Sequence, residues 1–139
     1  FEEEKYRGAP DIRLHEIDVA RPLEIAGERI VPVSGHHSER FEVTGYRIGR
    51  MAYLTDFKTI ADAEVGKLIG VELLVVNALR FRPHPSHFNV EEALALIARV
   101  APRRALITHV SHEIGRHAAT TALLPRGVEL AYDGLEIII

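Results

Sequence analysis

The stretch Val71-Glu72-Leu73-Leu74-Val75-Val76-Asn77 is nearly all apolar and rich in β-branched side chains. Such a run is typical of a strand that is buried on both faces between helical layers. Residues 105–108 have the same character and predict a second buried strand. Between the two runs, Asn89 and Glu92 form a capping signal that opens a helix, and Pro102 stops it. The order strand, helix, strand predicts an α/β fold with helices on the outer face of a sheet.

The part of the chain before this unit predicts mostly β structure. Short alternating apolar runs in residues 12–33, interrupted by turn signals such as Arg21-Pro22, favour antiparallel strands. Residues 45–48 and 51–55 favour two further strands. They flank Gly49-Arg50, which suits a two-residue hairpin turn because glycine adopts a positive φ readily. We therefore expect a mixed sheet that begins with hairpins.

Two more helices and a last hairpin are expected. Residues 59–62 resemble a capping signal for a short helix, with Gly70 at the C-terminal cap position. A further helix is predicted for residues 113–124. Residues 128–132 and 135–139 predict a closing hairpin across Asp133-Gly134.

Composition limits the class of protein. The chain has 139 residues, of which 47% are hydrophobic and 27% charged, and its apolar runs are too short to span a bilayer. The net charge of −3, with scattered basic residues, does not favour binding to nucleic acid. The absence of cysteine excludes disulfides and thiolate ligands and leaves histidine and carboxylate side chains as the strong metal ligands.

The organisation expected from these features is a single unit over residues 1–139, without a linker or repeat. Only residues 1–11 are expected to be poorly anchored. The chain opens on Phe1 and shows no signal-peptide pattern, so we expect a cytoplasmic protein and a segment cut from a longer chain.

Histidines are concentrated where predicted strands end. The chain has eight histidines, and seven of them lie at or just after such ends. Side chains on strand-end loops converge at one edge of a sheet while the strands hold them in place, as a metal site requires. These seven are His36, His37, His84, His87, His109, His112 and His117.

Asp56 closes the strand at residues 51–55 and is placed to bridge two cations through its two oxygens, although a turn cap explains it as well. His109 follows the buried strand at residues 105–108 and is either a ligand or a buried structural histidine. His112 lies three residues later, as a neighbour of the site or as the start of a helix.

The segment Arg80-Phe81-Arg82-Pro83-His84-Pro85-Ser86-His87 combines two guanidinium groups with two histidines and two prolines. Arginine can bind a phosphate or carboxylate with two donors, and histidine can protonate a leaving oxygen. The segment is thus a candidate substrate-binding loop. A solvated loop with proline-enforced turns is the alternative.

Four motifs in order resemble the metallo-β-lactamase superfamily, and more narrowly its phosphodiesterase-like branch, which includes phosphoribosyl cyclic phosphate phosphodiesterase. The resemblance runs over residues 10–135. Its motifs are Ala52-Tyr53-Leu54-Thr55-Asp56, Asn77-Ala78-Leu79-Arg80 with residues 83–87, Leu106-Ile107-Thr108-His109 with Ser111-His112, and Ala131-Tyr132-Asp133-Gly134-Leu135.

The resemblance implies an αββα sandwich with two divalent metal ions, commonly zinc or manganese, at one edge. In this family pattern Asp56 would bridge the metals and His109 would bind one of them. His36 or His37 would bind the other, with His37 slightly favoured. His87 would contact the phosphate or assist the leaving group.

Together with this resemblance, the chemistry of the segment at residues 80–87 indicates which residues meet the substrate. Arg80, Arg82 and His84 would bind a small phosphate ester. His112 would contact the metal ligands without binding a metal itself. The chemistry would be attack of a dinuclear-metal-bound hydroxide on a phosphodiester or related ester.

One departure from the family is large, because its His-x-His-x-Asp-His segment is absent from this sequence. The chain is thus expected to be the C-terminal half of the sandwich, to hold few or no metal ions tightly, and to be inactive without the remaining half. The alternative is a non-catalytic half-domain that pairs with itself or with another chain. A nuclease acting on RNA is less favoured, because stacking aromatics and a basic stripe are missing.

Overall fold

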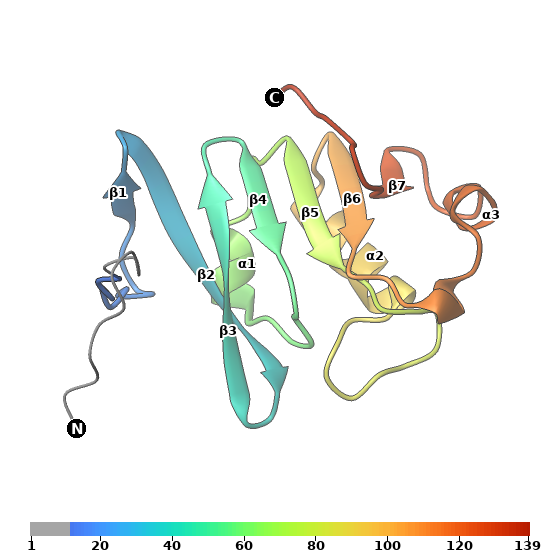
Figure 1. The fold of residues 1–139 in the computed structure, drawn as a ribbon, viewed down its shortest axis with the longest axis horizontal. Coiled ribbons are helices and arrows are strands. Elements are labelled where there is room, and N and C mark those ends of the chain that lie inside the picture. The colour runs from blue at the N-terminus through green and yellow to red at the C-terminus, as the bar shows by residue number, and fades with distance from the viewer. Residues whose placement is uncertain (1–11) are drawn as a thin grey trace, which may run out of the picture.

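The computed structural model describes residues 12–139, so the expectation for residues 1–11 lies outside the described part. It contains a mixed seven-stranded sheet whose strands follow one another in chain order (Figure 1). Neighbouring strands are antiparallel from β1 to β4 and parallel from β4 to β7. The strands are β1 (Leu23–Ile25), β2 (Glu28–Ser38), β3 (Phe41–Ile48), β4 (Met51–Leu54), β5 (Leu73–Asn77), β6 (Arg104–Thr108) and β7 (Val128–Leu130).

The antiparallel part confirms the predicted hairpin at Gly49-Arg50, where Gly49 has a φ of 55° between β3 and β4. Two predictions for this region are wrong. Residues 12–22 form no strand, and the strand expected to end at Val33 continues as β2 to Ser38. The extension occurs because β2 pairs with the whole of β3, a partner that lies later in the chain.

Helices α1 (Asp62–Gly66) and α2 (Val90–Val100) lie on one face of the sheet, as expected (Figure 1). The capping box of α2 is confirmed, since Asn89 accepts a hydrogen bond from the Glu92 amide and Glu92 accepts one from the Asn89 amide. The helix ends before Pro102 at Ala101, which is left-handed with a φ of 51°.

The other helix predictions need correction. α1 has no side-chain cap and ends at Gly66, and the positive φ of Gly70 follows a further turn. Residues 113–124 do not form one helix, because Gly115 has a φ of 98°. That backbone geometry separates a 3₁₀ turn (His112–Ile114) from α3 (His117–Thr121). Within the described residues no helix is long and apolar enough to cross a membrane.

The main core lies between the sheet and these helices. Phe57, which follows β4, is fully buried in it. Its ring lies so close to β2 that a Cβ added at Gly35 would come within 2.2 Å of it. A Cβ at Gly45 would likewise come within 2.3 Å of Leu54. Glycine at these two positions therefore lets the residues around Asp56 pack directly against β2 and β3.

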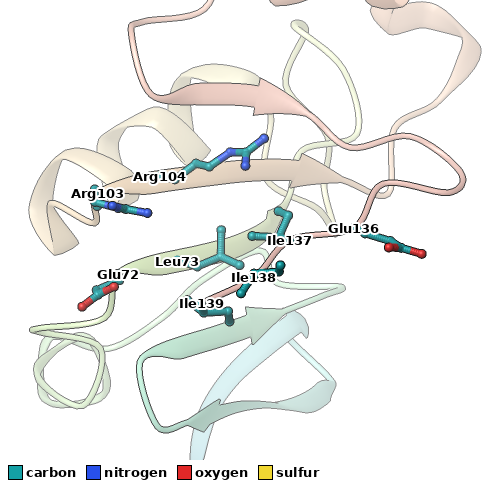
Figure 2. Close-up of a pocket in the computed structure, with 8 residues that line it drawn as sticks. All are labelled: Glu72, Leu73, Arg103, Arg104, Glu136, Ile137, Ile138 and Ile139. Atoms are coloured by element: carbon teal, nitrogen blue, oxygen red, sulfur yellow. The ribbon is translucent and has the colours of Figure 1, made fainter.

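The opposite face of the sheet carries a smaller apolar cluster. Leu73, Val75 and Leu106 are buried there, and Leu135 and Ile137 of the C-terminal segment pack against them. Figure 2 shows this segment beside Leu73, where it helps to line a pocket of about 280 Å³.

The predicted closing hairpin is therefore wrong. β7 pairs in parallel with β6, and residues 135–139 form no strand. The segment instead covers apolar side chains of β5 and β6 that would otherwise face solvent.

Candidate metal centre

Two of the predicted ligands lie at the carboxyl ends of parallel strands. Asp56 follows β4 and has a φ of 63°, and His109 follows β6 and has a φ of 57°. Left-handed backbone at a residue other than glycine is uncommon and costly, and it concentrates at functional sites. The same edge of the sheet therefore holds both side chains. Their Oδ1 and Nε2 atoms are 3.4 Å apart.

His37 joins this edge through an irregularity of β2. His36 pairs with Glu42 and Ser38 pairs with Phe41, so His37 is the extra residue of a β-bulge. Bulges redirect a side chain and are frequent beside active sites. The Nδ1 atom of His37 lies 3.0 Å from the backbone carbonyl of Asp56. A proton on Nδ1 donates to that carbonyl and leaves Nε2 free to bind a metal.

His36 takes a different position. Its main chain forms a bridge with Thr59, and its side chain is exposed. Of the two adjacent histidines that the sequence left open, the structure brings His37 into the cluster.

His87 lies at the centre of the group. Its Nε2 atom is 3.1 Å from Oδ1 of Asp56, and its ring stacks on His109 with the ring centres 4.8 Å apart. On the other side its Nδ1 atom is 3.2 Å from both Nδ1 of His84 and Oγ of Ser86. The segment at residues 84–87 thus brings both of its predicted histidines to the cluster.

These positions suit a metal ion. Within the described residues 12–139, ligand atoms of His37, Asp56 and His87 all lie within 4.8 Å of one another. Imidazole and carboxylate donors are ligands that zinc and manganese accept. The donor set therefore fits a divalent cation. His87 lies as close to Asp56 as His109 does, so its position would also suit a metal ligand. The family pattern gives His87 a substrate role instead.

The charges of the cluster are coupled. Burial raises the pKa of Asp56, but the hydrogen bond from His87 and the charge of nearby His109 outweigh it, so this pKa is lowered overall. Burial lowers the pKa of His87, and the neighbouring imidazoles of His37 and His109 lower it further against the raising effect of Asp56. The cluster therefore favours an ionised carboxylate beside a neutral imidazole, the forms that bind a metal.

The two predicted substrate arginines are already paired. Arg80 and Arg82 both donate to the carboxylate of Glu113, and Arg80 also donates to the Pro83 carbonyl over 3.1 Å. The two guanidinium groups hold the pKa of the exposed Glu113 below its usual value. The three residues tie the segment at residues 80–87 to the 3₁₀ turn. His112, in that turn, is exposed and shows no hydrogen bond to the cluster.

Sequence reasoning gave no role in the site to Asn77 or Glu113. Asn77 is fully buried at the end of β5, and both ends of its side-chain amide bond to the backbone of Phe57. The available signal was a polar residue closing an otherwise apolar run. Glu113 gave no such signal, because its partners lie more than thirty residues away in the chain.

Comparison with protein-family models settles the family. The model described as beta-lactamase superfamily domain matches residues 1–110, which is more than half of the 139 residues. The chain belongs to the beta-lactamase superfamily. Its mixed sheet with helices on one face is the corresponding α/β arrangement, as the sequence motifs predicted.

Three solved structures superpose on the chain. A structure described as a new diphosphatase from the PhnP family is 35% identical, with a TM-score of 0.87 over 91% of this chain and 49% of that one. The metallo-beta-lactamase fold protein YhfI from Bacillus subtilis is 17% identical, with a TM-score of 0.66 over 86% and 53% of the two chains. Human tRNase Z, short form, is 17% identical, with a TM-score of 0.62 over 81% and 44%.

One curated relative has a different kind of name. An octanoyltransferase from Porphyromonas gingivalis is 36% identical over an alignment of 140 positions that covers 100% of this chain and 28% of that protein. This chain therefore spans about a quarter of that relative and about half of the diphosphatase.

Proposed function

We propose that this superfamily member contributes part of the active site of a metal-dependent hydrolase that acts on phosphodiester or related ester bonds. The observation that supports the proposal best is the convergence of His37, Asp56, His87 and His109 at one edge of the sheet. The diphosphatase of the PhnP family, similar over 91% of this chain, supports phosphate chemistry. The octanoyltransferase is matched over only 28% of its length, so its name carries little weight.

The residues of this chain would divide the work as follows. His37, Asp56 and His109 would hold two divalent cations, zinc or manganese, together with ligands from the absent His-x-His-x-Asp-His segment. Divalent cations, when bound, polarise the ester and lower the pKa of water near neutrality. This chain alone would hold few ions tightly, because a closed zinc site needs about four ligands.

The segment at residues 80–87 would meet the substrate. His87 lies within hydrogen-bond distance of Asp56 and would orient the phosphate or pass a proton to the leaving oxygen. His84 would assist through its contact with His87. The Arg80 and Arg82 guanidinium groups would add positive charge beside the phosphoryl oxygens, but Glu113 partly offsets that charge. A cytoplasmic location and a small phosphate-ester substrate belong to this proposal.

The test uses the full-length product of the gene and the chromogenic diester bis(p-nitrophenyl) phosphate. We expect hydrolysis that is lost with a chelator and restored by Zn²⁺ or Mn²⁺. His37→Ala should lower metal affinity and activity at least tenfold, because removal of a group that only supports a ligand already costs about 10- to 100-fold. Absence of metal-dependent hydrolysis on this diester and on phosphate monoesters, diphosphates and carboxylic esters would contradict the proposal.

His36→Ala is the matched control, because it removes an adjacent histidine that lies outside the cluster. It should leave metal affinity within about twofold, inside the ordinary scatter of surface substitutions. An equal loss of metal affinity in the two variants would contradict the assignment of His37 as a metal ligand.

A second candidate is a half-domain that pairs with another copy of itself. Within residues 12–139, the C-terminal segment covers the face of the sheet that carries Leu73 and Val75, and Tyr53 and Ile138 are 42% and 98% exposed. Apolar side chains on such a face favour association. Light scattering of the 139-residue chain should then show a dimer, and a monomer at all concentrations would exclude this candidate.

A further inference from the structure

Asn77 is the last residue of β5, in the middle of the parallel strands, and its side chain is fully buried. A buried amide requires hydrogen bonds at both ends. Its Oδ1 atom accepts from the Phe57 amide at 2.8 Å, and its Nδ2 atom donates to the Phe57 carbonyl at 2.9 Å. One side chain therefore satisfies both polar groups of a single buried residue.

Phe57 directly follows Asp56, whose backbone is left-handed. Such a conformation persists only where the surroundings hold it. The two bonds from Asn77 fix the residue on one side of Asp56, and the buried Phe57 ring fixes it against β2. Asn77 therefore holds the backbone directly after the residue that carries the Asp56 carboxylate.

The same carbonyl reaches the second loop of the cluster. The Phe57 carbonyl also accepts the Phe88 amide at 2.8 Å, and Phe88 directly follows His87. Asn77, Asp56 and His87 are therefore joined through one backbone oxygen.

The residues after Asn77 extend the connection to the third loop. The Ala78 amide donates to the carbonyl of Thr108, the residue before His109, at 3.1 Å. The Leu79 amide donates to the Phe88 carbonyl, and the Leu79 carbonyl accepts from Ser111, both at 2.9 Å. The end of β5 brings no metal ligand of its own and instead links the loops that carry Asp56, His87 and His109.

We infer that Asn77 is the positioning residue of the metal centre, which sets the distance between the Asp56 carboxylate and the His87 and His109 imidazoles. This inference rests on the proposed function for its consequence, because metal affinity is what correct spacing would improve. Removing a residue that holds a metal ligand in place typically lowers metal affinity by roughly 10- to 100-fold. Without Asn77, the Phe57 amide would be buried without a partner, and the loop would have to shift to satisfy it.

The experiment compares Asn77→Leu with Thr120→Val in the full-length protein. Leucine keeps the branched shape of asparagine and removes both bonds to Phe57. Thr120 is also buried, donating to the Ile114 carbonyl at 2.8 Å, but it lies in α3, outside the three loops. We expect Asn77→Leu to raise the Kd for Co²⁺ about tenfold or more and to change the visible absorption of the bound ion. Thr120→Val should lower Tm and leave the Kd for Co²⁺ and the visible absorption unchanged.

Asn77→Ala provides a second variant if the leucine variant does not fold. Alanine removes both bonds to Phe57 but leaves space for a water molecule that can partly replace them. We expect a smaller rise of the Kd in the same direction. Wild-type Co²⁺ affinity and spectrum in a folded Asn77 variant would overturn the inference.

Amide hydrogen exchange in the metal-free protein separates this inference from the proposed function. We expect Asn77→Leu, or Asn77→Ala in its place, to speed exchange at the Phe57 and Phe88 amides by roughly tenfold relative to Ala93 in α2. A uniform change at all three amides would overturn the inference. If the wild-type protein binds no Co²⁺, the proposed function fails, and the exchange pattern still decides whether Asn77 holds the loops.

Discussion

The two ends of the parallel strands use left-handed backbone in different ways. At the end where β4, β5 and β7 begin, the residues with positive φ are Gly49, Gly70 and Gly127. At the other end, β4 and β6 lead into Asp56 and His109, which have positive φ without being glycine. Glycine adopts this conformation at little cost, whereas other residues lose about 1–2 kcal/mol. At the end that holds the candidate metal centre, both residues with this conformation contribute side chains to the cluster.

We call the end of the parallel strands that holds Asp56 and His109 the site end. Substitutions in the core beneath it should have the largest effect on stability. Phe57→Ala is expected to lower the free energy of unfolding by about 3–5 kcal/mol, because the buried ring would leave a cavity next to β2. Chemical denaturation measures the change. Phe81→Ala is the control, since Phe81 is 45% exposed, and it should change stability by less than about 0.5 kcal/mol. Similar losses for the two variants would show that Phe57 does not anchor this end.

The start of α2 lies just after the segment that carries His84 and His87, so its cap belongs to the site end. Asn89→Ala should lower the free energy of unfolding by about 1 kcal/mol, because the Glu92 amide loses its acceptor. Denaturant titration would detect this loss. No loss, or a gain in stability, would mean that the capping box does not stabilise the helix.

Ala101, at the opposite end of the same helix, is the exception to the comparison. It has a φ of 51° before β6, and it lies outside the cluster of His37, Asp56 and His87. Ala101→Gly should therefore raise the free energy of unfolding by about 0.5–1 kcal/mol. Thermal denaturation should show a higher Tm. A lower Tm would mean that the left-handed backbone of Ala101 is not a removable cost, and the contrast with Asp56 and His109 would fail.

The smallest effect is expected at the surface of this opposite end. Arg50 and Glu72 form an exposed ion pair at 2.7 Å. Glu72→Gln should cost only a few tenths of a kcal/mol, because solvent and salt screen the pair. The cost should disappear in 1 M salt. If Glu72→Gln instead lowered the free energy of unfolding by more than about 1 kcal/mol at all salt concentrations, the ion pair would be a major source of stability at this end.

Much of the fold was predictable wherever local signals agreed with the final structure. The apolar run that became β5, the hairpin at Gly49-Arg50 and the capping box at Asn89 all formed as expected. The closing hairpin failed because β7 found a partner in β6, which lies far from it in sequence. Local patterns cannot report that competition between distant partners.

The candidate site was predictable in residue type and less so in geometry. Strand-end positions indicated Asp56 and His109, and both lie in the cluster. The choice between His36 and His37 depended on a bulge in the pairing of β2 with β3, which no local pattern reveals. The pairing of Arg80 and Arg82 with Glu113 likewise depended on a turn that follows β6. Register and long-range contacts, more than residue chemistry, marked the limit of prediction.

The most direct test of the central claim, that Asp56 and its neighbouring histidines hold catalytic metal, is elemental analysis of the full-length gene product beside its Asp56→Ala variant. We expect about two divalent ions per chain in the wild-type protein and at most about one in the variant, because one carboxylate is proposed to bridge both ions. Equal metal content in the two folded proteins would contradict the account.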